Sequence, residues 1–292
     1  MNSTHHPRKI LVTGASDGIG KVTARELAAR GHHVVIVGRN AGKTQNAATE
    51  MRDAIRTSNG PGTIDFMIAD LARPTEVKNL ARQYTDRFGQ LDVLVNNAGA
   101  FFAGFIKTPD GFEQTFALNH LNYFYLTELM MPLLARSNAG RVVNVASEAH
   151  RGCDLDFDNL NGEKGATAYN GWRAYQRSKL ANILFTRELA RRVAGTSVTA
   201  NSLHPGFVAS KFGHNNGGVW GPLVKFSQMV FAINEDRGAA TSIFLADDPS
   251  VATVSGKYFD KCKERAPTAA ASNDDAARKL WDVTDKLLDR FR

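Results

Sequence analysis

The segment "VTGASDGIGK", residues 12–21, decides how the rest of the chain is interpreted. It follows the apolar run "KILVTG" at 9–14 and places glycines at positions 14, 18 and 20. Glycines let a backbone turn tightly and approach a ligand closely, and the N-terminus of the next helix offers free N–H groups to an anion. A turn that merely packs this helix on its strand is the alternative. The position of the loop after the first strand favours a site for a dinucleotide pyrophosphate.

Outside this loop, short apolar runs alternate with helical patterns. Strands are predicted at 9–14, 33–39, 63–70, 91–99, 140–147, 197–206 and 255–260. Helices are predicted around Tyr175 and at 21–30, 41–58, 74–88, 236–246 and 110–136, the last bent at Pro132. Nearly continuous apolar strands are typical of a parallel sheet covered on both faces. We therefore predict an α/β, single-domain Rossmann fold, with a doubly wound parallel sheet of about seven strands and helices on both faces.

No linker or change of composition divides the chain, so we expect one Rossmann-type domain over residues 1–292. Residues 1–8 are expected to form a flexible N-terminus. The last segment, "NDDAARKLWDVTDKLLDRF" at 273–291, predicts an amphipathic C-terminal helix capped by Asn273.

The composition is 43% apolar and 22% charged, which is ordinary for a soluble globular protein. No apolar run approaches the ~18–20 residues of a membrane span, and the N-terminus lacks the apolar core of a signal peptide. Two distant cysteines, Cys153 and Cys262, predict neither a disulfide framework nor a zinc site. The net charge of +7 fits an anionic cofactor or membrane surface, without a nucleic-acid motif. We predict a cytoplasmic protein with no metal site, transmembrane segment or nucleic-acid partner.

The stretch "RAYQRSKLANILF" at 173–185 places Tyr175 and Lys179 one helical turn apart, so both side chains leave the same face. A positive charge within ~4–6 Å favours a phenolate, so the pKa of Tyr175 is expected to fall from its usual value of about 10. This predicts a proton donor usable near neutral pH. An incidental aromatic–cation pair on a helix surface is the alternative, because Tyr-x-x-x-Lys alone is a weak pattern.

Five motifs now occur in the order of the short-chain dehydrogenase/reductases, which the chain resembles over about residues 9–290. They are Gly14-x-x-x-Gly18-x-Gly20, "NNAG" at 96–99, Ser147, Tyr175-x-x-x-Lys179 and "HPG" at 204–206. The segments "LDFDNLNGEKG" at 155–165 and "RGAATSIFLADDPSVATVSGKYFDKCKERAP" at 237–267 look most like the retinol dehydrogenase-type branch. The resemblance implies hydride transfer between a nicotinamide cofactor and a carbonyl compound or alcohol.

The resemblance also implies roles for four catalytic residues. Tyr175 would be the general acid, and Lys179 would lower the pKa of Tyr175 and bond the nicotinamide ribose. Ser147 would hold the substrate oxygen, and Asn119 would support a water relay to the lysine. Without the resemblance, Ser147 reads as a strand-end hydroxyl and Asn119 as a buried, satisfied amide. The predicted catalytic residues are Asn119, Ser147, Tyr175 and Lys179.

For the cofactor, the resemblance places adenine near Asp70 and the nicotinamide amide near Pro205. Taken alone, Asp70 would be a helix cap and "NNAG" a turn that ends a strand. The predicted cofactor-binding residues are Gly14, Ser16, Asp17, Gly18, Ile19, Gly20, Arg39, Asn40, Asp70, Leu71, Asn97, Ala98, Gly99, Tyr175, Lys179, Pro205, Gly206 and Val208.

Arg39 decides between the two nicotinamide dinucleotides. An acid at the end of the second strand usually meets a 2′-OH, whereas a cation suits a 2′-phosphate. Here Arg39 and Asn40 occupy that place, and a guanidinium binds phosphate through paired hydrogen bonds. We therefore predict NADP(H), with Lys43 assisting Arg39. A solvated surface arginine is the alternative, and Asp17 departs from the basic residue that many NADP-using relatives carry near the glycine loop.

The substrate side is predicted to be apolar. Ser147 precedes Tyr175 by 28 positions (175 − 147), about twice the spacing of many relatives, and the retinol dehydrogenase-type branch carries a similar insertion. Aromatic residues gather after the strand ends, where such folds build their clefts. They predict a lipophilic retinoid-, steroid- or fatty-aldehyde-like substrate, with a lid region at 207–235. The aromatic positions are "AFFAGF" at 100–105, Trp172, Phe207, Phe212 and "VWGPLVKFSQMVFAI" at 219–233, the last also a candidate for peripheral membrane contact.

Two other functions remain open from the sequence. One is reduction of a carbon–carbon double bond, as in protochlorophyllide reductase-like relatives, which needs no contact from Ser147. The other is a non-catalytic, NADP(H)-sensing binding protein, which has no need of all four catalytic residues. Apolar positions on the Tyr175 helix also predict a homodimer; they are Leu180, Ile183, Leu184 and Leu189.

Overall fold

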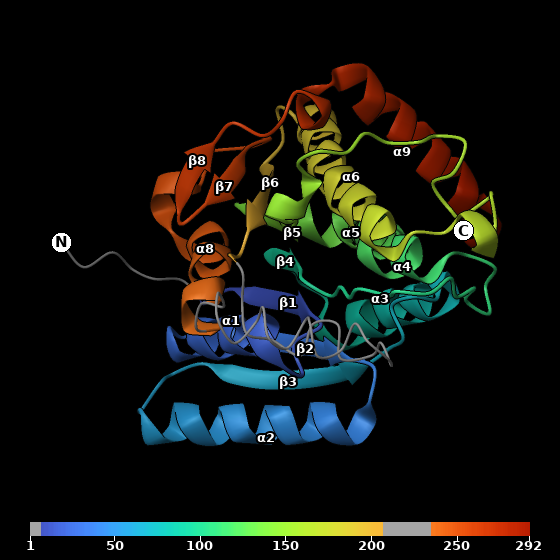
Figure 1. Ribbon diagram of the computed structural model, residues 1–292. Coiled ribbons are helices and arrows are strands. Elements are labelled where there is room, and N and C mark those ends of the chain that lie inside the picture. The colour runs from blue at the N-terminus through green and yellow to red at the C-terminus, as the bar shows by residue number, and fades with distance from the viewer. Residues whose placement is uncertain (1–6, 207–234) are drawn as a thin grey trace.

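The computed structural model describes residues 7–206 and 235–292, and within them eight strands form one sheet (Figure 1). The strands are β1 Lys9–Thr13, β2 His33–Gly38, β3 Thr63–Ile68, β4 Val93–Asn96, β5 Gly140–Val145, β6 Val198–His204, β7 Tyr258–Asp260 and β8 Lys263–Arg265. Their order is β3-β2-β1-β4-β5-β6-β7-β8, and every neighbouring pair is parallel except β7 with β8. This is the order of a doubly wound Rossmann sheet, so the predicted fold class is confirmed.

Helices cover both faces of the sheet because each strand sends alternate side chains to opposite sides. Ile10 and Val12 of β1 belong to one buried cluster, which includes residues of α1 Gly18–Ala29, α2 Ala41–Thr57 and α8 Glu235–Asp247. Leu11, between them in sequence, belongs to a second cluster with α3 Pro74–Phe88, α5 Asn122–Leu134 and α6 Gly171–Arg192. Figure 1 shows these two groups of helices on opposite sides of the strands.

Strand β8 is the one strand that the sequence patterns do not predict. The chain turns from β7 into β8 at Lys261 and Cys262, whose φ angles are 51° and 59°. A two-residue turn with two positive φ angles usually carries Asn-Gly or Asp-Gly. Because this turn has neither, "KYFDKCKER" contains no hairpin signal.

The segment predicted as one helix at 110–136 is three pieces. Helix α4, Gln114–Phe116, leads into a π-helical segment at Ala117–Leu121, and α5 follows directly. Glu113 caps the start, where its carboxylate accepts from the backbone N–H groups of Thr115 and Phe116. Helix α5 continues through Pro132, so the irregular part lies at Asn119 instead. Single π-helical turns inside helices occur frequently at functional sites.

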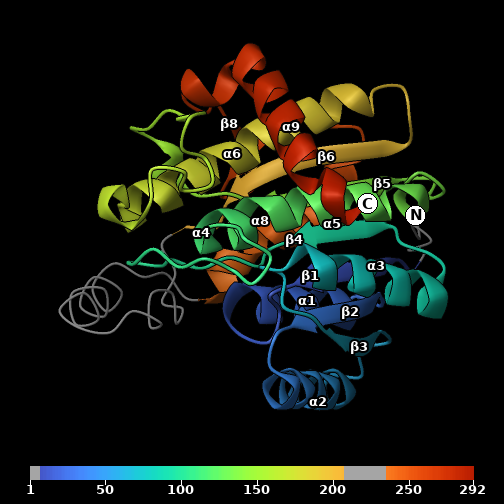
Figure 2. The same ribbon diagram turned by 90° about the vertical axis from the view of Figure 1, so that its right-hand side faces the viewer.

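The C-terminal helix α9, Asp274–Leu288, lies against α6 (Figures 1 and 2). It begins where Asn273 accepts a hydrogen bond from the N–H of Ala276, as its sequence predicts. The apolar α6 positions on which the homodimer prediction rests are all 1–2% exposed within this single chain. They therefore offer no apolar face to a second copy. These positions are Leu180, Ile183, Leu184 and Leu189.

Several sequence-based expectations fall on residues 1–6 and 207–234, outside the described part of the chain. They are most of the N-terminus 1–8, most of the lid region 207–235 with its segment 219–233, and the residues Phe207, Val208 and Phe212. In the described ranges, none of the helices combines the length and the apolar character needed to cross a membrane.

Candidate functional site

The predicted site residues gather at the carboxyl-terminal edge of the sheet, because parallel strands all end at the same edge. Gly14 follows β1, Arg39 follows β2, and Asn97–Gly99 follow β4. Ser147 comes two residues after β5, and Pro205 and Gly206 follow β6. The crevice outside these strand ends is where open α/β sheets bind their ligands.

The glycine loop after β1 fits closely against the turn after β4. A Cβ built on Gly14, whose φ is 64°, would lie 2.7 Å from the Cα of Ala98. A Cβ on Gly20 would lie 2.4 Å from Nδ2 of Asn97, whose amide donates to the carbonyls of Thr13 at 2.8 Å and Gly14 at 3.2 Å. Only glycine fits at these two positions. Asn97, which the resemblance places along the adenine ribose, has its side chain turned onto the glycine loop.

Asp17 is the N-cap of α1 and connects the glycine loop to α2. Its carboxylate accepts from the N–H of Gly18 at 3.0 Å and pairs with the Lys43 ammonium at 2.8 Å. Lys43, expected to assist Arg39, is therefore engaged by Asp17. Asn40 caps α2 by accepting from the Lys43 N–H at 2.9 Å. Arg39 is exposed and, within residues 7–206 and 235–292, has no ion pair, so its guanidinium is available to a ligand.

Tyr175 and Ser147 meet although they are far apart in sequence. Their side chains are hydrogen-bonded, and Tyr175 is only 8% exposed. Trp172, one turn earlier on α6, stacks on the Tyr175 ring with centroids 5.9 Å apart, and Phe101 meets the ring edge-on at 6.3 Å. The phenol thus lies between two apolar rings and beside one hydroxyl.

Lys179 lies beneath Tyr175, with its amino group 5.7 Å from the centre of the Tyr175 ring. Nζ donates to the carbonyl of Val145 at 3.0 Å. Burial lowers the pKa of Lys179 to about 7 and raises the pKa of Tyr175 to about 12, although the bond from Ser147 opposes the latter. The predicted fall in the pKa of Tyr175 is therefore wrong for the chain without a bound cofactor, where the pKa is raised. Desolvation disfavours both charged forms, so Lys179 loses much of the charge that would stabilise a phenolate.

Asn119 lies in the π-helical segment and is fully buried. Its amide bonds both backbone groups of Ala100, at 2.9 and 3.0 Å, and donates to Oγ of Ser178 at 3.0 Å. A Cβ on Gly99 would lie 3.2 Å from Oδ1 of Asn119 and 3.3 Å from Nζ of Lys179. Asn119 and Lys179 therefore converge at Gly99, as their expected shared role requires.

The expected adenine residues have structural partners of their own. Asp70 accepts from the N–H of Ala72 at 3.2 Å, while its own N–H donates to Glu76 at 2.7 Å. Leu71 is buried in the cluster that includes α3, whereas Ile19 packs against the separate cluster that includes α1. Ser16 lies close to the end of β2, since a Cβ built on Gly38 would lie 3.2 Å from Cβ of Ser16. Pro205 and Gly206 are half-buried at the end of β6.

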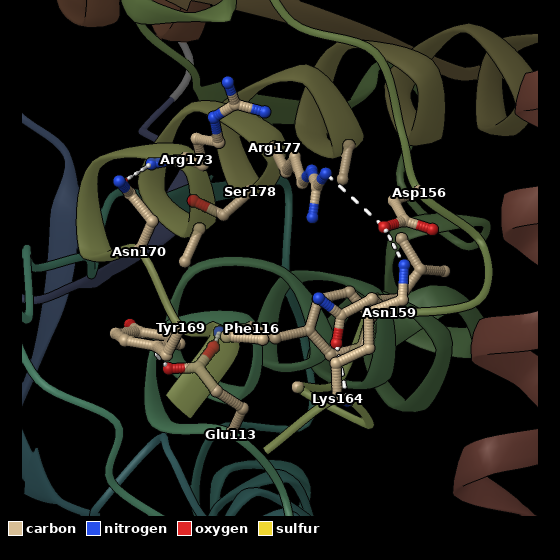
Figure 3. Close-up of a pocket in the computed structure, with 15 residues that line it drawn as sticks. Glu113, Phe116, Asp156, Asn159, Lys164, Tyr169, Asn170, Arg173, Arg177 and Ser178 are labelled. Carbon is tan, nitrogen blue, oxygen red and sulfur yellow. Dashed lines mark hydrogen bonds and ion pairs between the residues drawn. The ribbon is translucent and has the colours of Figure 1, made fainter. Parts of the chain in front are cut away.

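A cavity of about 190 Å³ lies beside α6, whose residues Arg177 and Ser178 help to line it (Figure 3). The insertion between Ser147 and Tyr175 forms its outer wall, where Asp156 pairs with Lys164 at 2.8 Å and Arg177 at 3.6 Å. Inside it, Glu113 accepts from the hydroxyl of Tyr169 at 3.0 Å. The sequence patterns identify the insertion, but they contain no signal for this cavity or for the roles of Glu113 and Tyr169.

Comparisons with known proteins agree with this geometry. The sequence model of short chain dehydrogenases matches residues 8–153. Retinol dehydrogenase 14 of Homo sapiens is 40% identical over 294 residues, which cover 97% of this chain and 87% of that protein. Human retinol dehydrogenase 11 is 40% identical over 279 residues, with 96% and 85% covered.

Solved structures show the same similarity. An uncharacterized protein from Mycobacterium paratuberculosis superposes with a TM-score of 0.75 at 31% identity, covering 96% of this chain and 92% of that one. A short chain dehydrogenase from Burkholderia cenocepacia J2315, in complex with NADP, gives a TM-score of 0.67 at 28% identity, with 87% and 95% covered.

Proposed function

The chain belongs to the short-chain dehydrogenase family, and on that premise we propose that it interconverts a lipophilic aldehyde or ketone and its alcohol with NADP(H). Membership makes it an oxidoreductase. The observation that carries the proposal is the meeting of Ser147, Tyr175, Lys179 and Asn119 at the carboxyl-terminal edge of the sheet.

The residues of this edge fit a nicotinamide dinucleotide. The glycine loop lets backbone segments approach closely at this edge, because a Cβ at Gly14 or Gly20 would meet neighbouring atoms. Backbone N–H groups and the helix dipole there suit a pyrophosphate. We propose that the cofactor-binding set comprises Gly14, Ser16, Asp17, Gly18, Ile19, Gly20, Arg39, Asn40, Asp70, Leu71, Asn97, Ala98, Gly99, Tyr175, Lys179, Pro205, Gly206 and Val208.

The preference for NADP(H) rests on Arg39. No acid follows β2, and the exposed guanidinium can form paired, charge-assisted bonds with a 2′-phosphate. Because Lys43 pairs with Asp17, Arg39 carries this interaction alone in the described part of the chain. The NADP complex of the Burkholderia cenocepacia relative supports the proposal.

The bound cofactor supplies a hydride to the substrate carbon, or accepts one from it. The chain's own residues bind the substrate oxygen and transfer the proton to or from it. Ser147 orients the substrate oxygen through a hydrogen bond, and the Tyr175 hydroxyl donates the proton to that oxygen during reduction. Lys179 lies next to Tyr175, with Asn119 close to Lys179, and we propose that they support the relay that returns a proton to the Tyr175 hydroxyl. Because burial alone raises the pKa of Tyr175, added positive charge beside the phenol would make it a better acid.

The rings around Tyr175 support the proposed lipophilic substrate class. Phe101 is 9% exposed and Trp172 is 51% exposed, so the two rings that contact the phenol form an apolar wall with one open indole. An apolar lining with few polar groups selects lipophilic ligands. The names of the retinol dehydrogenase relatives support a lipophilic aldehyde, ketone or alcohol.

The test is oxidation of NADPH with a panel of hydrophobic aldehydes and ketones, run with NADH as the cofactor control. We expect turnover with NADPH that falls by about 10²–10⁴-fold in Tyr175→Phe. Ser147→Ala is the companion variant, because reduction of a carbon–carbon double bond would tolerate the loss of that hydroxyl. Tight NADPH binding with no turnover on any substrate would contradict the proposal and favour a sensor.

A further inference from the structure

His120 follows Asn119 in the chain and is completely buried. Its ring packs against Phe116 and Phe185, with centroids 5.2 and 6.2 Å away. Burial lowers the pKa of His120 to about 4, so the imidazole is neutral near pH 7. A neutral imidazole has one nitrogen that donates and one that accepts.

The neighbours of His120 determine which nitrogen donates. Nδ1 lies 3.4 Å from Oδ1 of Asn182, which can only accept, so Nδ1 carries the proton. Nε2 then accepts from the hydroxyl of Thr284, 3.1 Å away on α9. The Asn182 amide nitrogen in turn donates to the carbonyl of Val145 at 3.4 Å. The three bonds run in one direction, from Thr284 through His120 and Asn182 to Val145.

The end point of this bridge is the carbonyl that anchors Lys179. The Val145 oxygen accepts from Nζ of Lys179 at 3.0 Å, and from the hydroxyl of Tyr123 at 3.4 Å. Val145 is also the last residue of β5, two positions before Ser147. The bridge therefore holds the strand end that places both the lysine and the serine.

We propose that Thr284 and His120 are positioning residues of the reaction, through which the C-terminal helix α9 holds the Val145 carbonyl, and with it Lys179, in the catalytic geometry. This inference rests on the proposed function, because it assigns a task to Lys179. It makes α9 a part of the active-site support, although the helix lies behind α6 and carries no site residue.

The surroundings of the bridge argue that stability alone does not require it. Thr284, His120 and Asn182 are each 0% exposed among aromatic and aliphatic side chains of α5, α6 and α9. Replacing both partners of a buried hydrogen bond with apolar groups of similar shape can be nearly neutral for stability. A directed run of three such bonds that ends at the carbonyl anchoring Lys179 is better explained by positioning, since a displacement of about 1 Å in an active site can cost about 10²-fold in rate.

The variant that tests the bridge is Thr284→Val, with Thr284→Ser as its conservative partner. Thr127→Val is the matched control, because Thr127 is also buried but accepts from Asn96 and makes no bond in the run from Thr284 to Val145. We expect Thr284→Val to lower kcat by about tenfold, while Thr284→Ser keeps the wild-type kcat. Thr127→Val should keep the wild-type kcat with a similar loss in Tm. Equal kcat in Thr284→Val and wild type, or equal losses in the Val and Ser variants, would overturn the proposal.

His120→Phe supplies a second variant that keeps the ring packing. If the two residues act through one bridge, the double variant His120→Phe/Thr284→Val should have the kcat of His120→Phe alone. Independent, multiplying losses would contradict a shared bridge. The Tm of each variant is measured beside its kcat, so a loss of kcat caused by poor folding can be told apart from a loss caused by the broken bridge.

A readout without turnover separates this inference from the proposed function. The ionisation of Lys179 can be followed by NMR of ¹³C-labelled lysine, where Tyr123 and Tyr175 are the titratable groups whose rings face its amino group. Loss of the held carbonyl should lower the pKa of Lys179 in Thr284→Val but not in Thr127→Val. Absence of wild-type turnover would count against the proposed function alone, whereas an unchanged Lys179 titration in Thr284→Val would count against the bridge.

Discussion

Gly20, in the first turn of α1, lies close to Asn97, which follows β4, so a single methyl group at Gly20 has a large consequence. In Gly20→Ala, the new Cβ would lie 2.4 Å from Nδ2 of Asn97 and 2.6 Å from the carbonyl oxygen of Gly14. We expect a loss of about 1–3 kcal/mol in the free energy of unfolding and weaker NADPH binding, since backbone must shift. Denaturant unfolding and NADPH fluorescence measure the two effects.

Gly42→Ala is the control for that substitution. Gly42 lies in α2, and the nearest atom to its Cβ would be 3.7 Å away, so alanine fits without strain. The helix preference of alanine should raise stability by about 0.5–1 kcal/mol. Equal changes in the free energy of unfolding at Gly42 and Gly20 would mean that close packing does not require glycine at position 20.

The proposed preference for NADP(H) can be tested at one side chain, Arg39. We expect Arg39→Asp to raise the KM for NADPH by about 10–100-fold and to improve the use of NADH, because a carboxylate repels a 2′-phosphate and accepts from a 2′-OH. Lys43→Ala is the control, since Lys43 pairs with Asp17. Steady-state kinetics with both cofactors give the comparison. A larger loss for NADPH in Lys43→Ala than in Arg39→Asp would refute the assignment to Arg39.

For single residues, the sequence was enough to predict which motif residues come together, but not how deeply they are buried or which side chains they pack against. The chain order of Ser147, Tyr175 and Lys179 was enough to predict that they meet, and the structure brings them together. The pKa of Tyr175 was predicted with the wrong sign, because spacing reveals the neighbouring lysine but not the burial of both groups. The packing of Asn97 on the glycine loop likewise depends on a contact between two distant strand ends.

At the scale of elements, the turn between β7 and β8 predicts a simple stabilisation. Lys261 and Cys262 both hold positive φ angles without glycine or asparagine. Replacing them with Asn-Gly should raise the free energy of unfolding by about 0.5–1 kcal/mol, because these residues adopt such angles at lower cost. Cys262→Ser, which keeps a side chain at the strained position, should bring no gain. A loss of stability in the Asn-Gly variant would show that the contacts of Lys261 and Cys262 outweigh their backbone strain.

Elements with clear end signals were predicted most accurately. Helix α3 begins at Pro74 and ends at Phe88, as predicted, because proline suits the first turn and Gly89 ends the helix with a φ of 64°. The π-helical segment at Ala117–Leu121 has no such signal. Its extra residue per turn is stabilised by the bonds of the Asn119 amide to Ala100, which periodicity along one segment cannot reveal.

The whole molecule should lose stability in mild acid because it buries neutral histidines. Burial is the largest cause that lowers the pKa of His120, to about 4, and of His150 and His204. Below about pH 6.5 the unfolded chain binds more protons than the folded one, so the free energy of unfolding falls as the pH drops towards about 4. His120 alone accounts for about 3 kcal/mol of this fall.

Denaturant unfolding near pH 7 and near pH 4.5 measures this dependence. In His120→Phe the difference between the two pH values should shrink by the share of His120, whatever the variant does to stability at neutral pH. A difference as large as that of the wild type would show that His120 does not supply the acid sensitivity.

Strand β8 has a consequence for how copies of the protein behave at high concentration. An open sheet edge is a template for adding strands from another molecule, and natural proteins block it with short, charged edge strands. Here the edge consists of Lys263, Glu264 and Arg265, all exposed, with Glu264 paired to Lys257 at 2.9 Å. Because it runs antiparallel to a parallel sheet and carries a charge at every position, β8 protects this edge from aggregation, and the sheet ends there.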